Sequence, residues 1–375
     1  ERISMLTPDT KLISVDDHVI EPPHTWLDRL PSQYRDRAPR IERRPDGREV
    51  WRYEDQVVPI SPGTVRHLPG ITPHSEAANF DEMRAGCYDP AQRLKEMDLD
   101  GVWAQVCFPN FARFAGHRFF PTTDPALSLA CIRAYNDFIV DEWCAAAPDR
   151  LVPLMLVPFW DVDASVTELK RLSGRVKAVA FSENPTVLGL PSVHTDHWDP
   201  LWAAVADADL AVCMHIGSSS VLVTSSPDAP VAVQWTATGI NSMLAMADWI
   251  FSGIFDRFPS LRVLLSEGGA GWIPYILERA QKLVDIRGSL NGLGISKTPH
   301  EIFRDNMFAC MVTDEFAIQS RHAIGIDNLA WEGDFPHSDG MYPRSRTNLE
   351  RVLADVPDDE ARKICQLNAQ RAFRL

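Results

Sequence analysis

The stretch KLISVDDH (11–18) decides the fold of this chain, because it is a short apolar run that ends in acidic and imidazole side chains. Similar apolar and β-branched runs recur along the whole sequence, and stretches with amphipathic helical patterns separate them. Such alternation is typical of a parallel sheet built from βα units. The runs that we identify as strands are KLISVDDH (11–18), GVWAQVCF (101–108), LVPLMLVP (151–158), VKAVAFSE (176–183), LAVCMHIG (210–217), LRVLLSEGG (261–269), NMFACMVTD (306–314) and NLAWEGD (328–334).

Eight strands with intervening helices fit a closed (β/α)8 barrel, a TIM barrel, better than an open doubly wound sheet. No GxGxxG motif follows an early strand, so the sequence does not support a dinucleotide-binding fold. We expect one α/β domain over residues 1–375. Its helices are expected over 125–147, 162–173, 198–208, 240–257, 271–287 and 315–324, with a last helix over 358–373.

The segment 31–86 is too long for a simple connection after a strand, so we interpret it as an insertion after the first strand. Within it, RIERRPDGREVWRYEDQVV carries a Pro-Asp-Gly turn between two alternating runs, which predicts a β-hairpin. The Pro- and Gly-rich stretch SPGTVRHLPGITPH (61–74) follows. Because loops after barrel strands surround the catalytic mouth, we expect the insertion to cover that mouth as a lid or substrate wall.

Charge and cysteine usage exclude several classes of protein. The formal net charge of −14 argues against a nucleic-acid partner. No run of about 18 apolar residues occurs, so we expect no membrane span. The seven cysteines form no CxxC pair and lie mostly in apolar runs, which suits reduced thiols in the cytoplasm. The segment ERISMLTPDT lacks the features of a signal peptide, so we expect a cytoplasmic protein; a homo-oligomer stays open.

Metal-competent side chains stand at the ends of five of the expected strands, and strand ends of a barrel converge on one mouth. Asp16 and His18 are two residues apart, so on a strand they share a face and can bind one ion. A single His or Glu at a strand end is more often hydrogen-bonded than a ligand, but the combination predicts a metal site. Its members are Asp16, His18, Glu183, His215, Glu267 and Asp334.

Two further residues lie close to these positions in the sequence. Glu21 follows His18 by three residues and is either an additional ligand or a residue that holds His18 by hydrogen bonding. His337 follows Asp334 by three residues, and we expect it to contact a ligand or the substrate.

The same residues carry a resemblance to a known family. SVDDHVIEPP, CMHIG, LSEGGAGWIPYILER, GDFPHSDG and QLNAQRAF occur in order over nearly the whole chain. They resemble the amidohydrolase-related barrel family that includes aminocarboxymuconate semialdehyde decarboxylase. The resemblance implies an amidohydrolase-like barrel in which Asp16, His18, His215 and Asp334 are metal ligands.

One departure from that family narrows the resemblance. The decarboxylases that resemble this chain carry a catalytic histidine just after the sixth strand, whereas this sequence has Glu267 in SEGGAGW. Glu183 stands where binuclear members of the superfamily hold a bridging group. The chain therefore resembles the barrel-fold non-heme diiron monooxygenases. This resemblance implies two iron ions, dioxygen, an electron donor and a CoA-linked, diterpenoid-type substrate. From their positions in the sequence, we expect Glu267 and His337 to be catalytic residues.

The ligand chemistry supports iron but leaves an alternative open. Four carboxylates and two histidines resemble the ligand set of carboxylate-bridged di-iron proteins. Manganese would satisfy the same ligands, and zinc sites favour fewer, histidine-rich ligands. The alternative is a hydrolase or decarboxylase that uses one divalent ion, Zn²⁺ or Mn²⁺.

The insertion carries a local excess of positive charge. Seven arginines and four acidic residues lie between residues 31 and 52. We expect Arg43 and Arg44 to bind the phosphates of a CoA-linked substrate, since guanidinium groups pair well with phosphate. In the alternative interpretation, these arginines pair with neighbouring acids on a solvated hairpin or contact another subunit.

Overall fold

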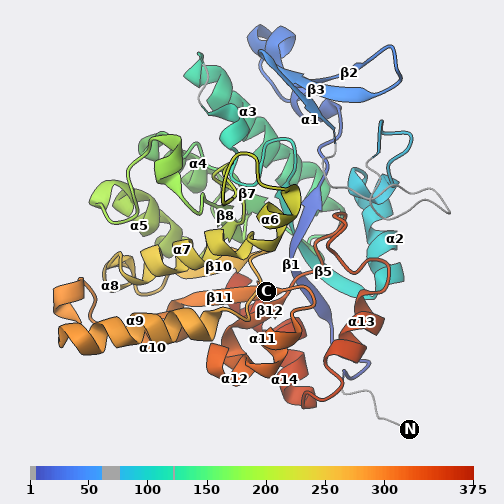
Figure 1. The fold of residues 1–375 in the computed structure, drawn as a ribbon. Coiled ribbons are helices and arrows are strands. Elements are labelled where there is room, and N and C mark those ends of the chain that lie inside the picture. Colours follow the sequence, from blue (N-terminus) through green and yellow to red (C-terminus); the bar gives the residue numbers. More distant parts are fainter. Residues whose placement is uncertain (1–5, 61–76, 121–122) are drawn as a thin grey trace.

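The computed structural model describes residues 6–60, 77–120 and 123–375, and confirms the predicted (β/α)8 barrel (Figure 1). Its parallel strands are hydrogen-bonded in the order β1–β5–β6 in one sheet and β7–β8–β9–β10–β11–β12 in the next. The strands are β1 (Leu12–Val19), β5 (Val102–Pro109), β6 (Leu151–Val152), β7 (Leu154–Met155), β8 (Ala178–Ala180), β9 (Ala211–His215), β10 (Arg262–Ser266), β11 (Met307–Met311) and β12 (Leu329–Trp331).

The two sheets join at both of their edges. β6 and β7 are halves of the single strand predicted over 151–158, and Pro153, which has no backbone N–H, separates them. At the other edge, the backbone N–H of Asp334 donates to the carbonyl of Asp16 at 2.9 Å, and that of His18 donates to the carbonyl of Phe335 at 2.7 Å. The ladder is therefore closed where the two ends of the barrel sequence meet.

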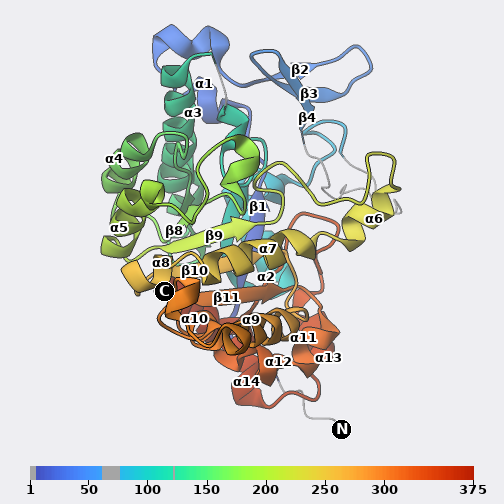
Figure 2. The ribbon, with the colours of Figure 1, turned by 60° about the vertical axis from the view of Figure 1, so that its left-hand side comes forward.

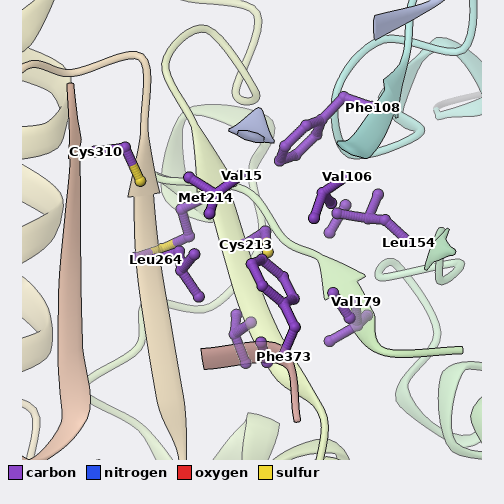
Figure 3. Close-up of a cluster of buried hydrophobic side chains, with 14 of the residues drawn as sticks. Val15, Val106, Phe108, Leu154, Val179, Cys213, Met214, Leu264, Cys310 and Phe373 are labelled. Atoms are coloured by element: carbon purple, nitrogen blue, oxygen red, sulfur yellow. The ribbon is translucent and has the colours of Figure 1, made fainter. Parts of the chain in front are cut away.

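Apolar side chains fill the barrel interior. Val15 of β1, Val106 of β5 and Leu264 of β10 lie together with Phe373 of the last helix (Figure 3). Arg262, the first residue of β10, donates from Nε to the carbonyl of Ala372 at 2.8 Å, so this helix covers the N-terminal ends of the strands. The opposite end, where the strands finish, is left for the functional site.

Helices form the outer ring (Figures 1 and 2). Five of the helices, namely α1, α2, α6, α10 and α13, were not predicted from the sequence. The helix predicted over 125–147 is α3 followed by a π-helical turn (Ile139–Trp143) and a 3-10 turn (Cys144–Ala146). The helices are α1 (His24–Leu27), α2 (Pro90–Asp100), α3 (Pro125–Phe138), α4 (Val162–Leu172), α5 (Asp199–Asp207), α6 (Val231–Thr236), α7 (Gly239–Ile250), α8 (Ile254–Arg257), α9 (Ile273–Arg287), α10 (Pro299–Asn306), α11 (Glu315–Gln319), α12 (Arg321–Ile324), α13 (Ser345–Val352), α14 (Asp358–Arg362) and α15 (Asn368–Phe373).

Local capping signals explain where several helices begin. Asp89 and Asp124 cap α2 and α3 by accepting hydrogen bonds from backbone N–H groups, and a proline occupies the first turn of each helix. Gly101 ends α2 with a left-handed φ of 76°, a conformation that glycine adopts without strain. Within the described residues, no helix combines the length and apolar character needed to cross a bilayer.

The strands of the insertion after β1 lie beyond the barrel, at the top of Figures 1 and 2. The predicted hairpin is confirmed as β2 (Arg40–Arg43) paired with β3 (Glu49–Tyr53). The structure adds an antiparallel third strand, β4 (Gln56–Pro59), after a turn in which Glu54 has a φ of 50°. The sequence pattern predicts one continuous strand in place of β3 and β4, because the turn between them lacks glycine and proline. The predicted loop over 61–74 lies outside the described residues.

Candidate metal centre

β1 brings Asp16 and His18 to the mouth on one face, as their spacing predicts. Both side chains are fully buried, and His18 Nε2 lies 3.6 Å from Asp16 Oδ1. The backbone carbonyl of His18 accepts a hydrogen bond from Arg93 Nη2 at 2.5 Å, which fixes the end of the strand. Two potential ligands are thus held at fixed positions from which solvent is excluded.

β9 and β10 add His215 and Glu267 to the same cluster. His215 Nε2 lies 3.4 Å from Asp16 Oδ2 and 3.0 Å from Glu267 Oε2. Its Nδ1 donates to the carbonyl of Ile216 at 2.6 Å. This bond leaves the lone pair on Nε2, the nitrogen that faces the carboxylates, as a metal-binding imidazole requires.

The loop after β12 adds Asp334 and His337. Asp334 Oδ1 lies 3.2 Å from His18 Nε2 and 2.9 Å from His337 Nδ1. The backbone φ is 53° at Asp334 and 58° at Glu267, the left-handed region that non-glycine residues rarely occupy. Such conformations cost about 1–3 kcal/mol each and cluster at functional sites.

The unsatisfied hydrogen-bonding groups of this cluster fit a bound cation. Both carboxylate oxygens of Asp16, both ring nitrogens of His18, Nε2 of His215 and Oδ2 of Asp334 are buried without a hydrogen-bond partner. Leaving so many buried polar atoms unpaired is costly unless a ligand completes them. Two groups have ligand atoms close enough to share an ion: Asp16, His18 and His215, and His18, Asp334 and His337. Their His and Asp donors suit a divalent metal ion.

The electrostatics of the site point the same way. Burial raises the pKa of Asp16 well above its usual value, and the negative charges of Glu332 and Glu267 raise it further. Burial lowers the pKa of His18 well below its usual value, with His337 and His215 adding to the effect. Without a cation, burial already favours the neutral imidazole of His18, the form that binds a metal, but it disfavours the anionic carboxylate of Asp16. A bound divalent ion would favour that carboxylate anion.

Sequence reasoning missed two buried acids of this site, Glu332 and Asp17. Glu332 accepts a hydrogen bond from the backbone N–H of Glu267 at 3.0 Å, and Asp17 Oδ1 accepts one from Phe335 at 2.8 Å. Burial raises the pKa of Asp17 to about 8. Glu332 lies two residues before Asp334, the same spacing that identified Asp16 with His18, so the sequence did contain its signal.

Three predicted ligands lie outside both groups of potential ligands. Glu267 is one of them, although its Oε2 is 3.0 Å from His215 Nε2. The other two are Glu183 and Glu21. The Glu183 carboxylate accepts hydrogen bonds from Ser218 Oγ, from the backbone and Oγ of Ser219, and from Asn241 Nδ2. Glu21 accepts three backbone hydrogen bonds, from residues 110–112. This geometry does not support the predicted ligand roles of Glu183 and Glu21, because donors of the protein already surround these carboxylates.

Two cavities open at the cluster and share Glu267 and Asp339 in their walls. The smaller has a volume of about 400 Å³, and Glu267 and His337 line it beside Val58 and Pro59 of β4. The larger has a volume of about 910 Å³ and lies between Glu332 and residues of α6 and α7. Both residues predicted to be catalytic therefore face the smaller cavity, and the insertion supplies part of its wall.

Arg43 and Arg44 line neither cavity. Arg43, on β2, lies 3.3 Å from Asp81 in an exposed ion pair, and other arginines of the insertion pair similarly, as Arg52 does with Glu42 at 2.6 Å. This pairing matches the alternative interpretation of a solvated hairpin. Phosphate binding by Arg43 and Arg44 stays a prediction.

A closed (β/α)8 barrel whose strand ends hold a buried cluster of imidazole and carboxylate groups defines the class of metal-dependent barrel enzymes. The chain belongs to the amidohydrolase family, whose model matches residues 24–375. Among curated relatives, the γ-resorcylate decarboxylase of Rhizobium sp. is 25% identical over 301 residues, which cover 76% of this chain and 86% of the relative.

Solved structures share the fold over almost the whole chain. An amidohydrolase from Mycobacterium avium subsp. paratuberculosis superposes with a TM-score of 0.75 at 20% identity, covering 98% of this chain and 100% of the other. The D314N variant of a 5-carboxyvanillate decarboxylase from Novosphingobium aromaticivorans, solved with bound manganese, has a TM-score of 0.67 at 16% identity and covers 98% of each chain.

Proposed function

We propose that this protein is a metal-dependent, nonoxidative decarboxylase of a small organic acid. The observation that carries the proposal is the pair His337–Asp334 beside the metal cluster, with 2.9 Å between Nδ1 and Oδ1. His337 lines the 400 Å³ cavity, so Nε2 is the nitrogen that can exchange a proton with a substrate. An imidazole oriented by a carboxylate at the edge of a cavity suits a general acid.

In the proposed reaction, the bond between the carboxylate carbon of the substrate and its neighbour breaks, and carbon dioxide leaves. The electron pair stays on the neighbouring carbon, which takes a proton from His337, while Asp334 stabilises the imidazolium before the transfer. No oxidant or reductant is consumed. A divalent cation would stabilise the developing negative charge, and the residues that would hold it are Asp16, His18, His215 and Asp334.

The relatives support this choice of reaction. The curated relatives include γ-resorcylate decarboxylases and a 2-amino-3-carboxymuconate-6-semialdehyde decarboxylase. Manganese is bound in the structures of two decarboxylases with the same fold. The carboxylate and imidazole donors of this site also suit Mn²⁺.

The test is release of carbon dioxide without oxygen. Manganese-loaded protein is incubated anaerobically with carboxyl-labelled 2,6-dihydroxybenzoate and 5-carboxyvanillate, followed by a broader panel of aromatic and aliphatic acids. We expect labelled carbon dioxide at the same rate with and without oxygen. His337→Gln should keep its metal and lose about 10²-fold or more of the rate. Failure of fully loaded protein to release carbon dioxide from any acid would contradict the proposal.

Glu267 favours a second candidate function, a non-heme diiron monooxygenase. Its carboxylate lies 3.0 Å from His215, where the decarboxylases that resemble this chain carry a histidine. The two groups of potential ligands share His18, and together with Glu267 they offer three carboxylates and three imidazoles that could hold two irons. Such an enzyme would consume one dioxygen, two electrons from a donor and two protons, insert one oxygen atom into a C–H bond and release the other as water.

Metal stoichiometry separates the two candidates. Protein purified without oxygen should hold one divalent ion per chain if it is a decarboxylase, and two irons if it is a monooxygenase. The monooxygenase would also consume dioxygen with a CoA-linked acyl substrate. Reversal of charge at Arg43 and Arg44 would then raise the KM for the CoA thioester more than for a pantetheine thioester, which lacks the nucleotide phosphates.

A further inference from the structure

The loop after β5 brings Arg113 and Arg118 to the wall of the 400 Å³ cavity. Glu21 fixes this loop, because its buried carboxylate accepts hydrogen bonds from the backbone N–H groups of residues 110–112 at 3.3, 2.7 and 3.1 Å. Arg113 itself has a left-handed φ of 63°, which the packed loop must hold against its intrinsic preference. The fold therefore places both arginines at defined positions facing the cavity.

Neither of these two arginines forms an ion pair with a described residue, although the negative charges of Glu183 and Glu21 act against the effect of burial and raise the pKa values of Arg113 and Arg118, respectively. Among the described residues, no carboxylate oxygen lies within 4.0 Å of either guanidinium group. Arg118 donates from Nε to the carbonyl of Phe111 at 3.2 Å and from Nη1 to Gln56 Oε1 at 2.8 Å, and both acceptors are neutral. The guanidinium of Arg113 lies 5.8 Å from the centre of the Phe114 ring.

Burial lowers the pKa of both arginines, and the charge of Arg113 lowers that of Arg118 further, to about 10. Both groups nevertheless remain cations at neutral pH. Two like charges held close together in a partly buried cavity are unfavourable, and an anion that accepts their unused guanidinium hydrogen bonds would offset part of that cost.

Other buried arginines of the chain are satisfied within the protein. Arg93 is fully buried and donates to the carbonyls of Gly86 and His18 and to Gln105 Oε1, and it lines neither cavity at the cluster. Arg262 pairs with Asp209 at 2.5 Å. Arg113 and Arg118 differ from both, because they face a cavity and neither forms an ion pair within 4.0 Å among the described residues.

We propose that Arg113 and Arg118 form an anion subsite for a second acidic group of the substrate, on a ring whose reacting carboxylate lies at the metal cluster. Phe111, Phe114 and Trp235 line the same cavity, so its walls suit a planar ring. The proposed function is needed only to identify the bound molecule as a substrate, since anion binding here requires no turnover. The inferred substrate class is therefore a cyclic diacid or an acid with an acidic phenol.

The experiment measures binding to the manganese-loaded full chain by calorimetry. Isophthalate carries two carboxylates on a ring, and benzoate carries one. Wild type should bind isophthalate more tightly. Arg113→Gln and Arg118→Gln should each weaken isophthalate binding on the order of 10-fold or more, and benzoate binding by less than about 2-fold, because a charge-assisted hydrogen bond is lost only for the diacid.

Three controls accompany these variants. Arg175→Gln removes an arginine that pairs with Asp141 on the surface, and it should leave both affinities unchanged. Arg118→Lys keeps the charge without the planar fork and should restore part of the affinity for the diacid. Metal content and melting temperature identify any variant that has lost the site or the fold.

Several outcomes would overturn the subsite. The first is that wild type binds isophthalate and benzoate with equal affinity, and the second is that the variants lose equal affinity for both acids. The third is that the variants weaken the binding of coenzyme A but of neither acid, which would show that the arginines bind phosphate. If replacing either arginine removes the preference for isophthalate, but the protein releases carbon dioxide from no acid, the subsite is confirmed and the decarboxylase proposal is wrong.

Discussion

Two pairs of buried carboxylates near the strand ends of this barrel differ in what their oxygens contact. Both oxygens of Asp16 and Oδ2 of Asp334 have no hydrogen-bond partner and lie within ligand distance of imidazole nitrogens. The oxygens of Glu183 and Glu21 instead accept hydrogen bonds from hydroxyl, amide and backbone N–H groups.

The difference separates potential metal ligands from residues that hold loops. A buried carboxylate without donors is unfavourable until a cation completes it, whereas a carboxylate surrounded by donors is stable without one. All four residues share burial and a place near the end of a strand, so neither property identifies a ligand. The hydrogen bonds made by each oxygen do.

The largest expected effect follows from removing a member of the unsatisfied cluster. His215→Ala should reduce bound metal to a small fraction and activity by at least ~10²-fold, since even the loss of partners outside the ligand set costs 10- to 100-fold. Metal analysis and circular dichroism check this, and His194→Ala, an exposed histidine 3.1 Å from Asp248, is the control. Full metal occupancy in His215→Ala would show that the cluster of unpaired groups is not the metal site.

Removing a carboxylate that is already surrounded by donors should act on stability instead. Glu183→Ala leaves hydroxyl and amide donors buried without an acceptor and should lower the free energy of unfolding by ~2–4 kcal/mol. Chemical denaturation measures the loss, and Glu183→Gln, which keeps one acceptor oxygen, should lose less. If the variant is folded but has lost its metal, Glu183 is a ligand after all.

Metal removal should lower the free energy of unfolding, because the unpaired groups of the metal cluster lose the ion that completes them. An ion at 100 times its dissociation constant adds about 2.7 kcal/mol to the free energy of unfolding. We expect the denaturation midpoint to rise with added Mn²⁺ after chelation in wild type and in Glu183→Gln. The same titration should leave His215→Ala unchanged, and a rise there would place the ion elsewhere.

The smallest effect is expected on the exposed insertion. Arg43 and Asp81 form an ion pair whose side chains are 55% and 80% exposed, and such pairs contribute little. Double charge reversal at Arg43 and Arg44 should shift the melting temperature by no more than ~2 °C and leave bound metal unchanged. A large loss of metal or stability would show that the hairpin supports the barrel mouth.

The architecture was largely predictable because its signals are local. Apolar runs such as 210–217 and 261–269 coincide with β9 and β10, since a buried parallel strand needs a continuous apolar sequence. The helix α2 was missed although Asp89, Pro90 and Gly101 mark its two ends in the sequence. The third strand of the insertion was not predicted, because the turn at Glu54 that precedes it contains no glycine or proline.

The sequence by itself determined the barrel and the strand-end positions of Asp16, His18, His215 and Asp334, because both depend on chain periodicity and on the convergence of parallel strands. Only the tertiary structure decided that hydrogen-bond donors surround Glu183 and Glu21, and that Arg113 and Arg118 face a cavity without an ion pair among the described residues. Those properties depend on donors and acceptors far apart in the sequence, such as Asn241 for Glu183 and Phe111 for Glu21. Periodicity places a side chain on an element, but only the packing of several elements decides what that side chain contacts.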